Sequence, residues 1–108
     1  MPKTEYLQGA LDLLILRTVA LRPNHGWGIQ QRIRQVTGET LSVSQGSLYP
    51  ALHRLEAAGL LASEMTTSEN NRKARVYRLT AAGRRRLDRE TADWQQFSLA
   101  VRRLLQLA

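Results

Sequence analysis

Two groups of side chains in this sequence are suited to binding a polyanion. A basic run between residues 72 and 89 holds eight of the sixteen Lys and Arg residues and a single acid, Asp88. Clustered guanidinium groups favour phosphate-rich partners, either nucleic acid or an anionic membrane surface. The second group, in residues 44–58, contains Ser, Gln, Tyr, His and Arg side chains that can hydrogen-bond to phosphate oxygens or base edges. A solvated surface in an arginine-rich chain is the simpler alternative for the basic run.

The sequence has no pattern typical of catalysis. Its only histidines, His25 and His53, have neither the spacing of metal ligands nor a neighbouring nucleophile motif. It contains no cysteine, which excludes disulfides and thiolate metal sites, and no glycine loop of the kind that binds nucleotide phosphates. We therefore expect no enzymatic activity, no cofactor and no metal, and we expect His25 to cap a helix or to lie at the surface.

Size and charge narrow the class of protein further. The 108 residues carry a formal net charge of +7, with a pI of about 11.0, and their number is typical of one domain. The core of so short a chain is modest, so contacts with a second copy can add to its stability. The sequence begins with no signal-peptide pattern, and the apolar run around Arg17 is too short to cross a bilayer. We expect a soluble, cytoplasmic protein with no membrane partner.

The apolar positions predict three helices, over residues 8–21, 25–37 and 44–58. The first is apolar nearly all round, which indicates burial on more than one side. Glycines that suit helix ends follow the second and the third: Gly38 and Gly59. The apolar side of the second helix consists of Ile29, Ile33 and Val36, and that of the third of Leu48, Ala51, Leu52 and Leu55.

The rest of the chain predicts a hairpin and a long helix. Segments 60–66 and 74–80 flank a polar, basic tip and have the pattern of two strands. Thr80 is a good N-cap, and the helical pattern that follows runs for about 27 residues, or roughly 40 Å. That length exceeds what three short helices and a hairpin can cover, so we expect a second copy of the chain to cover its apolar stripe. The stripe consists of Leu87, Trp94, Phe97, Val101, Leu104 and Leu105.

The predicted order of elements is typical of a winged helix-turn-helix. This mainly α fold has three helices and a two-stranded wing, here assigned to residues 1–80, followed by a C-terminal dimerisation helix over residues 81–108. In such a fold the third helix enters the major groove of DNA, and the hairpin tip touches the backbone or the minor groove.

The third helix contains a proline whose effect depends on where the helix begins. If Ser47 is the N-cap, Pro50 is the third helical residue and its missing N–H leaves no ladder bond unmade. If Ser44 is the N-cap, Pro50 removes one bond in the second turn. The sequence leaves both possibilities open, and the choice sets where Gln45 and Tyr49 point.

Four motifs resemble the PadR family of bacterial transcriptional regulators. They are GALDLLIL (9–16), HGWGIQQRI (25–33), QGSLYPALHRLEAAGLL (45–61) and RKARVYRLTAAGRRRL (72–87), which together cover nearly the whole chain. Trp27 stands where the family more often has Tyr. The single last helix is similar to that of the short members, whose dimers form chiefly through the last helix and the first. The resemblance implies a homodimeric repressor whose two third helices enter successive major grooves, about 34 Å apart, of a roughly palindromic operator.

The resemblance also implies roles for individual residues. The DNA-reading positions of the third helix would be Ser44, Gln45, Ser47, Tyr49, His53 and Arg54. At the wing, contacts to the backbone or the minor groove would come from Arg72, Lys73 and Arg75, beside Asn70 and Asn71.

The same resemblance suggests a ligand site on the last helix. Trp94 lies in the region where multidrug-sensing members stack a planar aromatic effector between the subunits, and ordinary packing between two chains is the alternative. The rival function for the whole chain is a general RNA- or polyanion-binding protein without ligand response. The sequence lacks the aromatic stacking platform that single-strand binders use.

Overall fold

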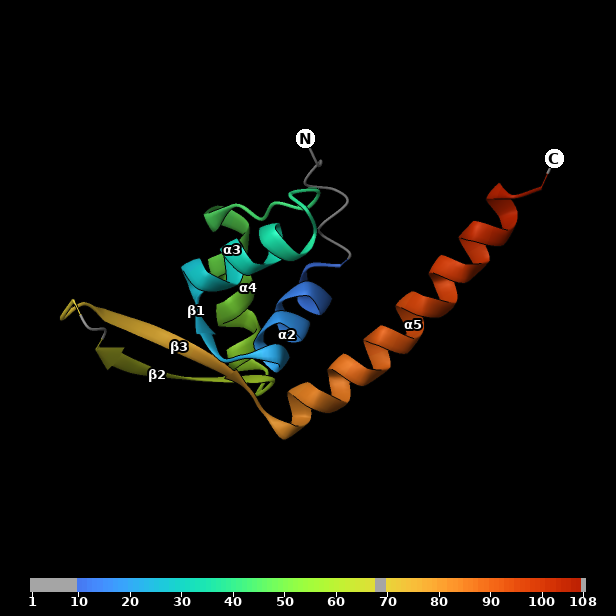
Figure 1. Cartoon of the computed structure of the whole chain (residues 1–108). Coiled ribbons are helices and arrows are strands. Elements are labelled where there is room, and N and C mark those ends of the chain that lie inside the picture. The colour runs from blue at the N-terminus through green and yellow to red at the C-terminus, as the bar shows by residue number, and fades with distance from the viewer. Residues whose placement is uncertain (1–9, 68–69, 108) are drawn as a thin grey trace.

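The chain folds into a winged head from which one long helix projects (Figure 1). The computed structural model describes residues 10–67 and 70–107. In chain order the elements are α2 (Leu11–Leu21), β1 (Asn24–His25), α3 (Gly26–Val36), α4 (Gln45–Ala57), β2 (Leu61–Thr67), β3 (Lys73–Leu79) and α5 (Ala81–Leu105). The predicted order of three helices, a hairpin and a long helix is confirmed. Residues 8 and 9 of the first predicted helix lie outside the described residues.

The three short helices bury their apolar sides against one another. Ile15 of α2, Ile29 of α3 and Leu48 of α4 are fully buried in this common core, since side chains at helical spacing share one face. Val36 was assigned to the same face, and this prediction is wrong: the side chain is 62% exposed. Val36 is the last residue of α3 and lies one turn beyond Ile33, outside the core.

The sheet has three strands, where the sequence predicts a wing of two. Its strand order is β1-β3-β2, and β2 pairs antiparallel with β3 from Leu61 opposite Leu79 to the tip of the wing. On the other edge of β3, Asn24 pairs with Tyr77. The additional strand, β1, is only two residues long, and two residues provide no alternation that sequence analysis can detect.

A threonine and a glycine build the joint between the head and α5. Thr80 is the N-cap of α5, as predicted: its Oγ1 accepts a hydrogen bond from the Gly83 amide at 3.0 Å and donates one to the Gly59 carbonyl at 2.7 Å. Gly83 packs so closely that a Cβ at this position would overlap the carbonyl oxygen of Leu60. These contacts fix the start of α5 against the turn that follows α4.

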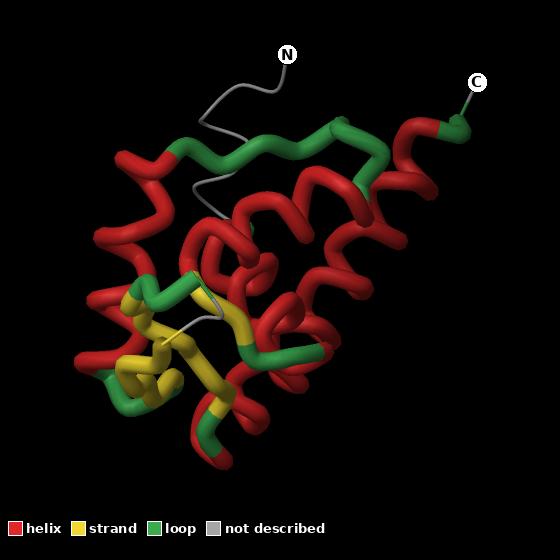
Figure 2. The backbone as a smooth tube through the Cα atoms, turned by 60° about the vertical axis from the view of Figure 1, so that its left-hand side comes forward, coloured by secondary structure: helices red, strands yellow, loops and turns green. Residues whose placement is uncertain are grey.

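Beyond this joint, α5 passes along α2 and then leaves the head. Figures 1 and 2 show its C-terminal turns reaching past the other elements, and the molecule is accordingly elongated, at 59 × 31 × 20 Å. Only Gly83 and Leu87 are buried among the residues of α5. The remainder of its apolar stripe is exposed within the single chain: Trp94, Phe97, Val101, Leu104 and Leu105.

Candidate nucleic-acid interface

The start of α4 decides between the two possibilities for Pro50. Ser44 is the N-cap, and its Oγ accepts a hydrogen bond from the Ser47 amide at 3.2 Å. Pro50 is therefore inside the helix, in its second turn. The hydrogen bond that an amide at this position would donate to the Gly46 carbonyl is consequently absent.

α4 directs a polar face away from the core. Gln45 and His53 are exposed and Ser47 is half-buried, while the leucines at the intervening positions are buried. The loop that precedes the helix is tied to α3, because the Gln30 Nε2 donates to the Val43 carbonyl at 2.7 Å. The polar face is thus held on a helix whose start is fixed.

Tyr49 lies against the first residue of α3. A Cβ at Gly26 would come within 2.7 Å of Tyr49 Cε1 and 2.8 Å of its hydroxyl oxygen, so a larger residue would displace the ring. Tyr49 remains 37% exposed, and it therefore packs on the neighbouring helix while keeping an edge in solvent. No spacing in the sequence predicts this contact between two helices.

The N-terminus of α3 presents two stacked rings. His25 is the N-cap, as predicted, and its Nδ1 accepts a hydrogen bond from the Gly28 amide at 3.0 Å. The neutral ring then carries its proton on Nε2, which is left as a donor. The His25 ring stacks on the exposed Trp27, with centroids 6.1 Å apart and planes at 15°. Both rings lie next to the Gly26 position on which Tyr49 packs.

Arg54, a predicted DNA contact, is paired within the protein. Its Nη1 and Nη2 donate to the two carboxylate oxygens of Asp12, at 2.9 and 2.7 Å. The hydrogen bond to Asp12, and then the carboxylate charge, raise the pKa of Arg54 above its ordinary value. The pair joins the last turn of α4 to the first turn of α2. Because the two residues are 42 positions apart, no local pattern could indicate it.

The open end of the wing is basic. Arg72 and Lys73 are exposed there, where β3 begins. Asn71 adopts a left-handed φ of 59° just before them, a conformation that asparagine tolerates better than most residues. Residues 68 and 69 of the predicted tip lie outside the described residues.

Arg75, the third predicted wing contact, is hydrogen-bonded to a residue nearer the base of the wing. Its Nη1 donates to Ser63 Oγ at 3.1 Å, and that hydroxyl donates to Glu56 Oε2. These bonds connect β3 through β2 to α4. Tyr77 is buried beside them, and its pKa is raised by burial first and by the charge of Glu56 second. Sequence reasoning missed Glu56 and Ser63, which lie on separate elements.

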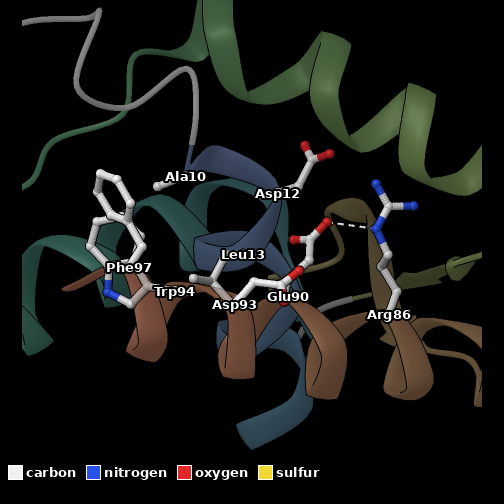
Figure 3. A pocket seen from close by; sticks show the side chains of 8 residues that line it. All are labelled: Ala10, Asp12, Leu13, Arg86, Glu90, Asp93, Trp94 and Phe97. Carbon is white, nitrogen blue, oxygen red and sulfur yellow. Dashed lines mark hydrogen bonds and ion pairs between the residues drawn. The ribbon is translucent and has the colours of Figure 1, made fainter. Parts of the chain in front are cut away.

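A pocket of about 440 Å³ lies between α2 and α5, with Trp94 on its wall (Figure 3). The rings of Trp94 and Phe97 are 6.0 Å apart and tilted by 38°. The lining consists of Ala10, Asp12, Leu13, Arg86, Glu90, Asp93, Trp94 and Phe97. The predicted ligand residue therefore borders a pocket that combines aromatic and acidic side chains.

The described part of the chain shows neither a metal-binding cluster nor a helix that could span a membrane. Within residues 10–67 and 70–107, no three His, Cys, Asp or Glu side chains gather as a metal site requires. Across the same described part of the chain, no helix combines the length and the apolar character that a bilayer crossing demands.

Comparison with known proteins gives concordant results. The family described as "Transcriptional regulator PadR-like family" matches residues 15–89. Transcriptional regulator Rv3488 of Mycobacterium tuberculosis is 42% identical over 97 residues, which are 90% of this chain and 87% of that protein. A PadR-like transcriptional regulator from Bacillus cereus has a similar crystal structure, with a TM-score of 0.84 and 26% identity over 96% of this chain and 99% of the other. A transcriptional regulator from Clostridium thermocellum shares the fold, with a TM-score of 0.85 and 24% identity over 94% and 99% of the two chains.

Proposed function

The chain belongs to the PadR-like family of transcriptional regulators, and we propose that it is a repressor that binds a roughly palindromic operator in double-stranded DNA as a homodimer. In this role the protein acts in the cytoplasm, where its DNA lies. Residues 1–80 form the DNA-binding domain in this proposal, and residues 81–108 form the dimerisation helix.

The exposed polar face of α4 supports its role as the recognition helix. Gln45 and His53 point away from the core, and a glutamine amide can pair with adenine in the major groove. Ser44, Ser47 and Tyr49 contribute hydroxyls to the same surface. Arg54 is a weaker candidate than its neighbours, since Asp12 already neutralises much of its charge.

The wing supplies the cationic part of the interface. Arg72 and Lys73, at its open end, are suited to the phosphate backbone or to a narrow minor groove. Arg75 stabilises the joint between the wing and α4 through Ser63, so it acts on DNA mainly by orienting the wing.

The uncovered stripe of α5 is the observation that carries the homodimer. Leu104 and Leu105 are 70% and 78% exposed, on a helix whose C-terminal turns extend away from the head (Figure 1). A contiguous apolar face of this kind marks a protein interface. A second copy offers the same face, and isologous pairing gives the closed two-fold symmetry that a palindromic operator requires.

Release of DNA by a planar aromatic effector completes the proposal. Trp94 is half-exposed and borders the pocket between α2 and α5, which is large enough for a small aromatic molecule. Fluorescence titration of a Trp27→Phe variant with planar aromatics tests this step, because Trp94 is then the sole tryptophan. Quenching that saturates is expected, and no response across a varied panel would leave Trp94 as a packing residue.

The dimeric assembly and the binding of double-stranded DNA are tested separately. Sedimentation at micromolar concentration should give a dimer, and a stable folded monomer would contradict the architecture. Selection of bound fragments from genomic DNA should yield a two-fold symmetric site, and a reporter carrying that site should be repressed by the protein. Competition between duplex DNA and single-stranded RNA decides against the rival function; a preference for RNA would overturn the DNA proposal.

A further inference from the structure

A second pocket, of about 530 Å³, lies where the end of α2 meets β1, α3 and β3. It is lined by Thr18, by residues 21–25, by Arg32 and by Val76, and its volume is usual for a small-molecule site. Side chains alternate along a strand, so Val76 points away from the core face on which its neighbour Tyr77 is buried. Because no residue of α4 lines this β1 pocket, it is separate from the polar face of the recognition helix.

The formal charges in the β1 pocket are all positive. Arg22 and Arg32 line it, and no described Asp or Glu does. Neither guanidinium has a hydrogen bond or an ion pair with any residue in the ranges 10–67 and 70–107. By contrast, Arg34, two positions after Arg32 on α3, is paired with Glu39 at 3.0 Å. The pocket therefore gathers positive charge that the described part of the protein does not neutralise.

Two half-buried side chains add N–H donors to the same lining. His25 Nδ1 accepts a hydrogen bond from the Gly28 amide, so the neutral ring keeps its proton on Nε2. Asn24 Oδ1 accepts a hydrogen bond from the His25 amide at 2.9 Å, which leaves the Asn24 Nδ2 as a donor. These bonds hold both side chains in place without using their N–H groups.

We propose that the β1 pocket binds a phosphate group, carried by a small phosphate ester or by the DNA backbone, through Arg22, Arg32 and the Nε2 proton of His25. Guanidinium groups match the geometry of phosphate oxygens and bind them by charge-assisted hydrogen bonds. An uncharged molecule of the same shape lacks this attraction, and a cation is repelled. The pocket shares no lining residue with the pocket beside Trp94, so the inference is independent of the effector proposed there.

His25 connects the β1 pocket to the DNA-binding face. Its ring lines the pocket and stacks on Trp27, and the next residue, Gly26, packs against Tyr49 of α4. A phosphate ester held beside His25 adds negative charge close to the start of α3 and should weaken operator binding. By linkage, bound DNA weakens the binding of the ester by the same factor. This coupling rests on the proposed DNA binding, whereas the phosphate site itself does not.

Calorimetric titration of the full chain without DNA tests the small ester as the source of the phosphate. The probe is glucose 6-phosphate, with glucose as its uncharged match, at constant ionic strength. Glucose 6-phosphate should bind at least about tenfold more tightly than glucose, because charge-assisted hydrogen bonds are the stronger ones.

A pair of arginine variants locates the binding. Arg32→Gln should weaken the binding of glucose 6-phosphate by about tenfold. Arg34→Gln removes the same charge from the same helix outside the lining and should leave the affinity within about twofold. Both positions are exposed, so both variants should fold. Equal losses in the two variants would overturn the site, because net charge and not the pocket would then attract the phosphate.

The salt dependence of operator binding tests the DNA backbone as the source. If a backbone phosphate occupies the pocket, Arg32→Gln should reduce the slope of log affinity against log salt by about 0.9, and Arg34→Gln should not. If a small ester occupies it, the slope should stay unchanged. Glucose 6-phosphate should then weaken operator binding by about fivefold in the wild type and have no effect in Arg32→Gln.

The proposal is overturned when both tests are negative. In that case glucose 6-phosphate binds no better than glucose, and Arg32→Gln and Arg34→Gln give the same salt slope. A wild type that binds no operator at all would contradict the proposed function instead, and the titration without DNA would still decide whether the pocket binds phosphate.

Discussion

The α4 helix and the outer part of α5 have similar apolar stripes, but only the stripe of α4 is buried within the chain. In α4, Leu48 and Leu52 are fully buried against α2 and α3. In α5, Leu104 and Leu105 belong to an equally regular stripe but remain exposed. Helical spacing decides which side chains share a face, whereas the presence of a neighbouring element decides whether that face is covered. The head is therefore stabilised within one chain, and the outer part of α5 requires contacts from outside it.

The largest expected effect is the loss of stability when a substitution creates a cavity in the core of the head. Leu52→Ala removes a fully buried side chain and should lower the free energy of unfolding by about 3 kcal/mol. Denaturant titration measures it, with Leu107→Ala, an exposed position beyond α5, as a control that stays within about 0.5 kcal/mol. Similar losses for the two variants would remove the distinction between a self-sufficient head and its extension.

The joint between the two regions is probed by a pair of glycines. Gly83→Ala should cost about 2 kcal/mol, because its Cβ would overlap the Leu60 carbonyl. Gly46→Ala, also in the first turn of a helix, would bring its Cβ only into ordinary contact with Ser44 Oγ at 3.9 Å, and it should be neutral or stabilising by up to about 1 kcal/mol. Thermal unfolding of both variants compares them, and equal midpoints would contradict the close packing at Gly83.

Substitutions in the outer region of α5 should affect dimerisation more than folding. Leu104→Glu places a charge on the uncovered stripe and should weaken dimerisation by at least about tenfold, or about 1.4 kcal/mol. Gln96→Glu adds the same charge to α5 at another exposed position and serves as the control. Sedimentation across a dilution series measures both. An unchanged dimer in Leu104→Glu would show that another surface holds the two chains together.

The smallest expected effect is on the salt dependence of DNA binding, compared between an arginine of the wing and an arginine far from the wing. Arg72→Ala should reduce the slope of log affinity against log salt by about 0.9, the contribution of one phosphate contact. Arg103→Ala removes an equal charge from the last turn of α5, on the opposite side of the molecule from the wing (Figure 1), and should leave the slope unchanged. Equal slopes for the two variants would mean that net charge, rather than the wing, contacts DNA.

Elements with strong local signals were predicted well. The caps at His25 and Thr80 and the glycines that end α3 and α4 follow from short-range chemistry, and both glycines have positive φ, at 59° and 78°. Strand β1 was not predicted, because its two residues form a strand only by pairing with β3. The exposure of Val36 was missed for a related reason: periodicity gives the face of a residue but not the point at which the covering element stops.

The candidate interface likewise combines features that were predicted from the sequence with contacts that only the structure revealed. The polar side chains of α4 and the basic wing follow from residue type and spacing, and their DNA-reading roles stay predictions. Three contacts came from tertiary structure alone: Tyr49 on Gly26, Arg54 on Asp12, and Arg75 through Ser63 to Glu56.

The sequence by itself determined the order of elements, the fold class and the family, because these depend on periodicity, caps and motifs that are local along the chain. Tertiary structure decided which polar residues are already engaged. It paired Arg54 and Arg75 with groups on other elements, chose Ser44 over Ser47 as the cap before Pro50, and brought acids and aromatics together in one pocket. Such pairings depend on distances in space between residues far apart in sequence, and no spacing along the chain encodes those distances.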